Sequence, residues 1–188
     1  MNPSLCIRAR GARGARWATL SLALLCSSSP GALIEAWLAD DLAVNHNDGG
    51  QVTTWTSSSG RHLSAGGADQ PVYKEAVTPT GGAAVRFNES RLRVGAGNSP
   101  VGGLSQFSVA VVFRADAAGA NDGTQWWAKT GLVDAEQLGF TNDWGAVLDE
   151  NGQVGFGTGG GDNSTYSTGP SIVDGNFHAA IFSWGPNG

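Results

Sequence analysis

Four side chains with oxygen ligands crowd into a stretch of ten residues in this sequence: Asp134, Glu136, Asn142 and Asp143. Carboxylate and amide oxygens on loops suit Ca²⁺, which takes about 6 to 8 oxygen ligands, backbone carbonyls included. The pattern therefore predicts a calcium site. The alternative is that these side chains are solvated and form Asx turns, in which Asp or Asn accepts hydrogen bonds from nearby backbone N–H groups.

Three tryptophans are candidates for contact with a ligand: Trp126, Trp127 and Trp144. An indole ring offers a flat apolar face with a polar edge, which suits stacking on a sugar ring. If residues 125–129 form a strand, neighbouring side chains point to opposite faces, so one ring of the adjacent pair points away from the core. The alternative is that the rings fill the core, as we expect for Trp37, Trp55 and Trp184.

Catalytic chemistry is not indicated, and no catalytic residue is predicted. Glycoside hydrolysis needs two carboxyl groups about 5 to 9.5 Å apart across a cleft. Asp134 and Glu136 would share one face of a strand, but their surroundings predict a loop. His46, His62 and His178 are scattered, and no Ser/His/Asp motif, phosphate loop or metal-binding His pair is present. We therefore expect a protein that is not an enzyme.

The N-terminal residues have the pattern of a secretory signal peptide. Four arginines between residues 8 and 16 precede an apolar run over residues 17–26, and small residues follow up to Ala32. We predict a signal peptide over residues 1–31, with cleavage near Gly31 or Ala32, and a secreted or cell-surface protein. The apolar run is too short to span a bilayer, which takes about 20 residues. The alternative is a leader that arises from a wrongly assigned start.

Composition limits the partners of the remaining chain. Residues 33–188 hold all sixteen acidic residues and seven of the eleven Lys and Arg, a net charge of −9. Such a charge disfavours nucleic acid and anionic membranes and suits divalent cations. Both cysteines, Cys6 and Cys26, lie in the leader, so the exported part can hold neither a disulfide nor a Cys-ligated zinc.

Short alternating segments separated by Gly-rich turns predict about nine to eleven β-strands and no helix of 3.6-residue period. Residues 107–114 form the strongest of them and are apolar on both faces. Such a strand lies mid-sheet with a layer on each side, or bends across a core. An Asn-Gly turn at 151–152 predicts a hairpin of 145–148 with 153–156. The other expected strands cover 33–39, 52–56, 71–73, 83–87, 92–94, 125–129 and 177–184. The pattern is typical of an all-β sandwich or jelly roll.

Several pieces of the sequence, in this order and spacing, resemble a laminin-G-like, concanavalin A-like jelly-roll domain of the bacterial secreted type. The last piece, Asp174-Gly175-Asn176-Phe177-His178, is similar to the D-G-x-W-H turn and strand of such domains, with Phe177 where Trp is usual. The other pieces are Trp37-Leu38, Trp55, Ser59-Gly60, Pro71-Val72-Tyr73, Val85-Arg86-Phe87-Asn88, Leu92, Phe107 to Arg114, Gly131 to Glu136 and Thr141 to Gly145.

The resemblance implies one domain over residues 32–188, a jelly-roll β-sandwich of antiparallel strands. Such domains continue into further strands, so we expect an incomplete domain that lacks its last strands, with further domains of a longer chain among its partners. It also implies an extracellular binding or adhesion module for a glycan or glycoprotein, assisted by Ca²⁺. The alternatives are a structural spacer of a larger surface protein and a degenerate glycoside hydrolase. The E-x-D-x-x-E run of concanavalin A-like glucanases is absent.

Overall fold

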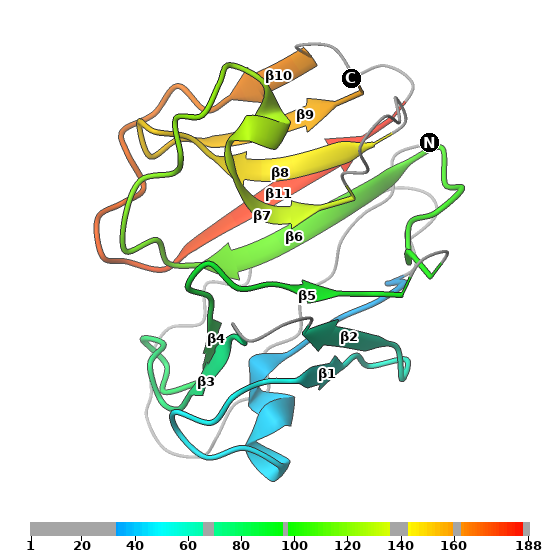
Figure 1. Cartoon of the computed structure of the whole chain (residues 1–188), viewed down its shortest axis with the longest axis vertical. Coiled ribbons are helices and arrows are strands. Elements are labelled where there is room, and N and C mark those ends of the chain that lie inside the picture. Colours follow the sequence, from blue (N-terminus) through cyan, green and yellow to red (C-terminus); the bar gives the residue numbers. More distant parts are fainter. Residues whose placement is uncertain (1–32, 66–69, 96–97, 136–142, 160–162, 186–188) are drawn as a thin grey trace, which may run out of the picture.

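The computed structural model describes residues 33–65, 70–95, 98–135, 143–159 and 163–185. In this part of the chain the regular structure is antiparallel β-sheet with short 3-10 helices and without an α-helix (Figure 1), so the prediction of an all-β fold is confirmed. The elements in chain order are η1 (Ala39–Val44), β1 (Thr54–Thr56), β2 (His62–Ala65), β3 (Val72–Lys74), β4 (Ala84–Arg86), β5 (Leu92–Arg93), β6 (Phe107–Phe113), η2 (Trp126–Ala128), β7 (Thr130–Asp134), β8 (Trp144–Leu148), β9 (Val154–Thr158), β10 (Asn163–Tyr166) and β11 (His178–Trp184).

The described strands form four sheets. One half of the molecule holds a three-stranded sheet in the order β1-β2-β5 and the pair β3-β4 (Figure 1). The other half holds a four-stranded sheet in the order β10-β9-β8-β7 and the pair β11-β6. All of these pairings are antiparallel. The arrangement is consistent with a β-sandwich.

Aromatic side chains join the two sheets of the second half. Phe107 of β6 lies 5.1 Å from Trp144 of β8 between ring centroids, and Phe156 of β9 lies 5.7 Å from Phe182 of β11. Trp144 also stacks on Phe156 at 5.9 Å, and Phe107 stacks on Trp184 at 6.1 Å. Aromatic pairs of this kind contribute about 0.5–1.5 kcal/mol each beyond the area that they bury. They therefore hold the four-stranded sheet against the β11-β6 pair.

The first half has a smaller core of its own. Leu42 of η1, Val52 and Tyr73 of β3 are buried together. Half-buried apolar side chains from the strands around them complete this core, namely Trp55, Ala83, Val85 and Leu92. The helix η1 follows the extended residues 33–38, and its first turn carries Asp40 and Asp41, which favour a helix N-terminus.

The turn before β11 explains why the Asp-Gly-Asn-Phe-His segment has this composition. One oxygen of Asp174, Oδ1, accepts hydrogen bonds from the backbone N–H of Asn176 and from Nε2 of His178, each at 2.9 Å. The His178 hydrogen bond and then the Asn176 N–H lower the pKa of Asp174 to about 2. Gly175 has φ 80°, a conformation that side chains disfavour. Each of these residues therefore shapes the entry into the last strand.

Two strand predictions are wrong, for different physical reasons. Residues 33–38 run extended but pair with no described strand; instead, Ser58 N–H donates to the Ala36 carbonyl at 2.8 Å and Trp55 Nε1 donates to the Leu38 carbonyl at 3.1 Å. Residues 126–128 form the 3-10 helix η2, because the indole of Trp126 turns down onto the four-stranded sheet.

Three strands were not predicted: β2, β7 and β10. The strands β7 and β10 have polar or glycine residues where an apolar alternation would mark a strand, as in Asn163-Ser164-Thr165-Tyr166 of β10. The strand β2 does alternate, with Leu63 and Ala65 half-buried, but over only four residues. The strand β10 lies at one edge of the four-stranded sheet and β7 at the other. Edge strands need little apolar surface, so hydrophobic pattern alone does not identify them.

The sequence predicts that β6 has a layer of structure packed on each face, or that it bends across a core. In the described part of the chain, one face of β6 is not covered by another layer. The side chains of Phe107, Val109, Val111 and Phe113 alternate with more exposed ones, and Val112 keeps 67% of its surface exposed. Opposite Val112 on β11 is Ala179, and the neighbouring Ile181 is 60% exposed. This outer face of the β11-β6 pair is thus apolar and open among the described residues.

One face of the four-stranded sheet packs against the β11-β6 pair, and glycine residues occupy the opposite face. Gly145 of β8 lies opposite Gly157 of β9, and a Cβ atom at either position would overlap the indole of Trp126. Gly155, two residues before Gly157, leaves room in the same way for the ring of Tyr166. We call this surface the glycine floor. It lets two aromatic rings lie directly on the backbone of the sheet.

Substitution on the glycine floor should therefore destabilise the protein. We expect Gly145→Ala and Gly157→Ala each to lower the free energy of unfolding by about 1–3 kcal/mol, the usual cost of forcing a methyl group into a packed site. Gly169→Ala is the matched control, because a Cβ there meets nothing within 4 Å. Urea unfolding midpoints measure the difference, and equal midpoints for all three variants would contradict the packing described.

Candidate functional site

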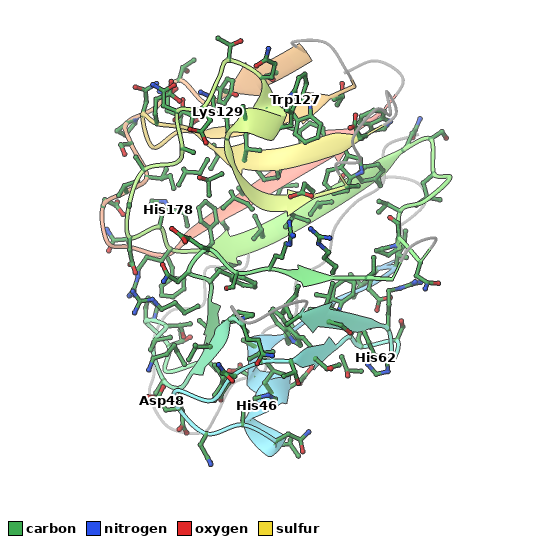
Figure 2. The ribbon with its side chains drawn as sticks, in the orientation of Figure 1. His46, Asp48, His62, Trp127, Lys129 and His178 are labelled. Carbon is green, nitrogen blue, oxygen red and sulfur yellow. The ribbon has the colours of Figure 1, made fainter. Side chains whose placement is uncertain are left out.

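The structure separates the three candidate tryptophans. Trp126 is 1% exposed and donates a hydrogen bond from Nε1 to the Gly159 carbonyl at 3.3 Å. Trp144 is 7% exposed and belongs to the aromatic core. Trp127 is 42% exposed and meets Trp126 edge-on, with ring centroids 5.7 Å apart (Figure 2). Only Trp127 of the three offers an open ring face, so a shared stacking platform does not form.

The four calcium candidates are described only in part, because Glu136 and Asn142 lie outside the described residues. Asp134 is exposed at the end of β7, opposite Gly145. Asp143 precedes β8 and is 7% exposed, and its buried Oδ1 has no hydrogen-bond partner in the part of the chain that the structure describes. Within the ranges that the structure describes, no group of three His, Cys, Asp or Glu side chains lies close enough to hold a metal.

The histidines are spread over the molecule, as expected (Figure 2). His46 lies beside the ring of Tyr73, 6.2 Å between centroids, and His62 Nδ1 lies 3.0 Å from the hydroxyl of Thr56. His178 donates to Asp174 in the turn before β11. Each histidine therefore has a local structural partner.

A depression of about 510 Å³, most of whose lining residues are polar, lies beside β10 at one edge of the four-stranded sheet. The loop before η2, the β8–β9 turn and the edge strand β10 surround it. We call it the Tyr166 depression. Its lining residues are Asn121, Asp122, Gly123, Thr124, Lys129, Asp149, Glu150 and Tyr166. Figure 2 shows Lys129 at this end of the molecule, near Trp127.

The charged groups of the depression are held in fixed pairs. Lys129 Nζ lies 2.6 Å from Glu150 Oε2, and only 5% of the Lys129 side chain is exposed. This hydrogen bond is the main reason that the pKa of Lys129 is raised and the pKa of Glu150 is lowered. Both groups are therefore charged at neutral pH.

Asp149 is buried and serves the β8–β9 turn. Its Oδ1 accepts from the backbone N–H of Asn151 at 2.9 Å and of Gln153 at 2.7 Å, and its Oδ2 accepts from the Asn151 amide at 3.2 Å. Gly152 completes the turn with φ 72°. The predicted Asn-Gly hairpin is confirmed, and both oxygens of Asp149 are occupied by it.

Tyr166 lies at the edge of this depression with an unsatisfied group. Its ring packs on Gly155, and its buried hydroxyl has no hydrogen-bond partner among the described residues. Buried polar groups are nearly always hydrogen-bonded, so this hydroxyl is unusual. Neighbouring atoms cover it, and a ligand group at the depression would reach it only after they move. Tyr166 is not among the site residues predicted from the sequence. The signal was Val154-Gly155-Phe156-Gly157, whose alternate glycines leave one face of a strand bare.

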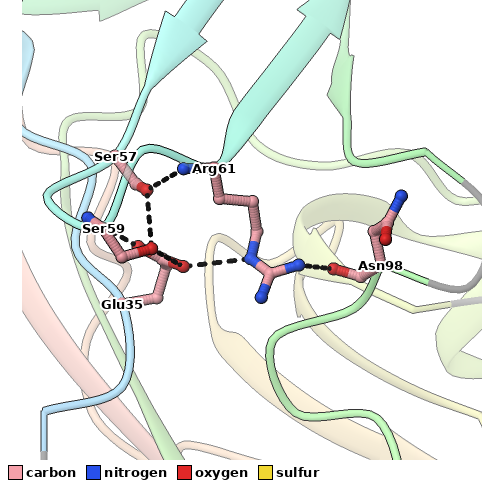
Figure 3. Close-up of polar contacts among 5 residues, drawn as sticks. All are labelled: Glu35, Ser57, Ser59, Arg61 and Asn98. Carbon is pink, nitrogen blue, oxygen red and sulfur yellow. Dashed lines mark hydrogen bonds and ion pairs between the residues drawn. The ribbon is translucent and has the colours of Figure 1, made fainter.

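A second depression of about 480 Å³ lies in the other half of the molecule, lined by Ser59, Gly60, Arg61, His62, Ser64, Gly95 and Asn98. Beside it a buried carboxylate, Glu35, ties the N-terminal extended segment to the β1–β2 turn (Figure 3). Glu35 accepts from the hydroxyl of Ser59 at 2.8 Å and from Nε of Arg61 at 3.0 Å. Arg61 also donates from Nη1 to the Asn98 carbonyl. We call this group the Glu35 clamp.

The Glu35 clamp changes the acidity of its carboxyl group. Burial by itself raises the pKa of Glu35, but hydrogen bonds from Ser57, Ser59 and Arg61 outweigh burial and lower the pKa to about 2. The ionised form therefore binds its partners more strongly than the protonated form does. In the unfolded chain a glutamate has a pKa of about 4.3.

Glu35→Gln should destabilise the protein in a pH-dependent way. Because the folded pKa is lowered, the stabilisation is present above the unfolded pKa and is lost as pH falls through the folded pKa, that is between about pH 4.5 and 2. We expect the variant to lose on the order of 2 kcal/mol at pH 7 and to approach wild type near pH 2. Glu75→Gln, an exposed acid, is the control. Guanidinium unfolding at several pH values measures both, and a pH-independent difference for Glu35→Gln would contradict this account.

Fold and depressions together define the molecule as an antiparallel all-β protein with polar concavities at loop and sheet edges. No family model, curated protein or solved structure matches the chain. No helix among the described residues is long and apolar enough to cross a membrane.

Proposed function

We propose that this protein is an extracellular glycan-binding module with a concanavalin A-like jelly-roll sandwich, and that it contacts its ligand at the Tyr166 depression. The observation that carries the proposal is the depression with its polar lining residues, beside which Tyr166 has a buried hydroxyl without a partner among the described residues. A sugar presents several hydroxyl groups, each of which both donates and accepts. The amide of Asn121, the hydroxyl of Thr124 and the carboxylate of Asp122 offer complementary groups beside that ring.

The alternative functions receive less support from the same geometry. A hydrolase needs one carboxylic acid that carries a proton and one free carboxylate. In the Tyr166 depression the pKa of Glu150 is lowered, mainly by its hydrogen bond with Lys129, and Asp149 is occupied by its turn. These two acids are therefore poorly placed for proton transfer. A structural spacer does not need concave surfaces such as the depressions beside Tyr166 and Arg61.

We also propose that Ca²⁺ binds at the rim formed by β7 and β8 and assists glycan binding. Asp143 brings a buried and unpartnered Oδ1, a state that a cation would relieve, and Asp134 lies across the strand pair. These two residues would hold the ion together with Glu136 and Asn142, and backbone carbonyls would add further oxygens. When bound, Ca²⁺ would neutralise these acids and order the rim.

Tyr166→Phe tests the glycan site, because it removes only the orphaned hydroxyl. We expect the free protein to be as stable as wild type or more stable, since an unsatisfied polar group is lost. Affinity for a glycan selected on an array of neutral oligosaccharides should fall about tenfold, the effect of one hydrogen bond of about 1.4 kcal/mol. Tyr73→Phe, the same change at the only other tyrosine, is the control. Isothermal titration calorimetry gives the affinities, and unchanged binding by Tyr166→Phe would place the ligand elsewhere.

The calcium site is tested by comparing the melting temperatures of wild type and of an Asp143 variant with and without calcium. At a calcium concentration of 100 times Kd, wild type should gain about 2.7 kcal/mol of stability, seen as a higher melting temperature. Asp143→Asn should show no such gain, and without calcium it should be at least as stable as wild type. Asp122→Asn, an acid of the Tyr166 depression, should keep the full response. The absence of both titration heat and a melting shift in wild type would eliminate the calcium site.

A further inference from the structure

The outer face of the β1-β2-β5 sheet collects exposed polar side chains. Thr54 lies opposite Ser64, which in turn lies opposite Arg93, and Thr56 lies opposite His62. Residues directly opposite each other share a face, so these five side chains point the same way. All five are exposed, whereas Trp55, Leu63 and Leu92 between them are half-buried toward the other side. We call the five residues, together with Arg91, the cationic face.

The charge of this face is positive on an otherwise acidic chain. Arg91 and Arg93 are both exposed and alternate with the half-buried Leu92 and Val94. Neither arginine forms an ion pair with an acidic residue in the described ranges. Residues 52–65, which contain β1 and β2, include no acidic residue at all. The two guanidinium groups are therefore available to an anionic partner.

The face continues into a concavity at one end. His62 and Ser64 also line the second depression, whose other walls include Arg61 and Asn98. Arg61 is already neutralised by Glu35, so it adds hydrogen-bond donors rather than net charge. A long ligand could thus lie across the sheet with one end in this depression.

We propose that the cationic face binds a polysaccharide that carries carboxylate or sulfate groups. The guanidinium groups of Arg91 and Arg93 recognise the acidic groups by charge-assisted hydrogen bonds. The hydroxyl of Ser64 lies beside Arg93, and those of Thr54 and Thr56 extend the same face across β1; all three match sugar hydroxyls. A small free anion would use the charge of the face but not its row of hydroxyl groups. The combination therefore fits an acidic sugar chain.

The charge of the whole protein disfavours the other large polyanions. Residues 33–188, the part expected to be exported, carry a formal net charge of −9. Duplex DNA carries one charge per about 1.7 Å of its axis, so it would be repelled by the rest of the surface. Anionic membranes present a similarly dense negative surface. A polysaccharide with about one charge per sugar is less densely charged than duplex DNA, so the rest of the surface repels it less.

This site is separate from the Tyr166 depression and does not depend on it. His62 and Lys129, which mark the two sites, lie at opposite ends of the molecule in Figure 2. Failure of one site in an experiment therefore leaves the other intact. Binding of neutral oligosaccharides and binding of acidic polysaccharides can be measured on the same variants.

The test is affinity electrophoresis through gels that contain polygalacturonate, dextran sulfate or uncharged dextran. We expect wild type to be retarded by at least one of the two acidic polymers and not by dextran. Arg93→Gln should weaken the apparent affinity about tenfold, as expected for the loss of a hydrogen bond to a charged group, and Arg91→Gln/Arg93→Gln should abolish it. Arg86→Gln is the matched control, since it removes the same charge from β4, where Arg86 lies 3.5 Å from Asp116.

Retardation by polygalacturonate alone would identify carboxylate groups as the ligand, and retardation by dextran sulfate alone would identify sulfate groups. Equal losses in Arg93→Gln and Arg86→Gln would show non-specific charge attraction and would overturn the proposal. Stronger binding to duplex DNA or to phosphatidylserine vesicles than to either polymer would also overturn it, as would no retardation of wild type. Because Arg93 is exposed, its variant should keep the wild-type melting temperature.

Discussion

The indole of Trp126 lies directly on the backbone of two paired strands, at the point where Gly145 faces Gly157. Any side chain at these two positions would lift the ring off the sheet. The ring anchors η2, so the loop before it returns along the sheet and forms one wall of the Tyr166 depression. The neighbouring Gly155 admits the ring of Tyr166. The lack of side chains at these three glycines therefore lets both rings lie on the sheet, and the Tyr166 depression forms beside them.

Most of the fold could be predicted where a strand has one apolar face. The strands β6, β8, β9 and β11 bury alternating or continuous apolar side chains, and their predicted positions are confirmed. The strand β10 could not be found, because an edge strand over glycine needs no apolar pattern. The different exposures of Trp126 and Trp127 could not be predicted from the local pattern either. Their opposite exposures follow from a 3-10 turn over two distant glycines, which no local pattern of residues reveals.

The candidate site was less predictable than the fold, because acidic residues serve several purposes in turns. Asp149 and Asp174 each accept backbone N–H groups and set the geometry of a turn. Glu35 holds the extended N-terminal segment through Ser59 and Arg61. In sequence such acids cannot be told from cation ligands, since both kinds lie in polar loops. Asp143 differs from them in having a buried oxygen without a partner, which only the packed structure reveals.

The same use of acids explains how an acidic chain can present a cationic face. Carboxylates gather where turns and loops supply N–H groups or basic side chains, as for Asp48 with Lys74 and Glu75 and for Glu150 with Lys129. Paired in this way, they contribute little field at a distance, because opposite charges cancel and salt screens the remainder within about 10 Å. Arg91 and Arg93 have no such partner among the described residues. The local field over the β1-β2-β5 sheet is therefore governed by these two arginines rather than by the net charge.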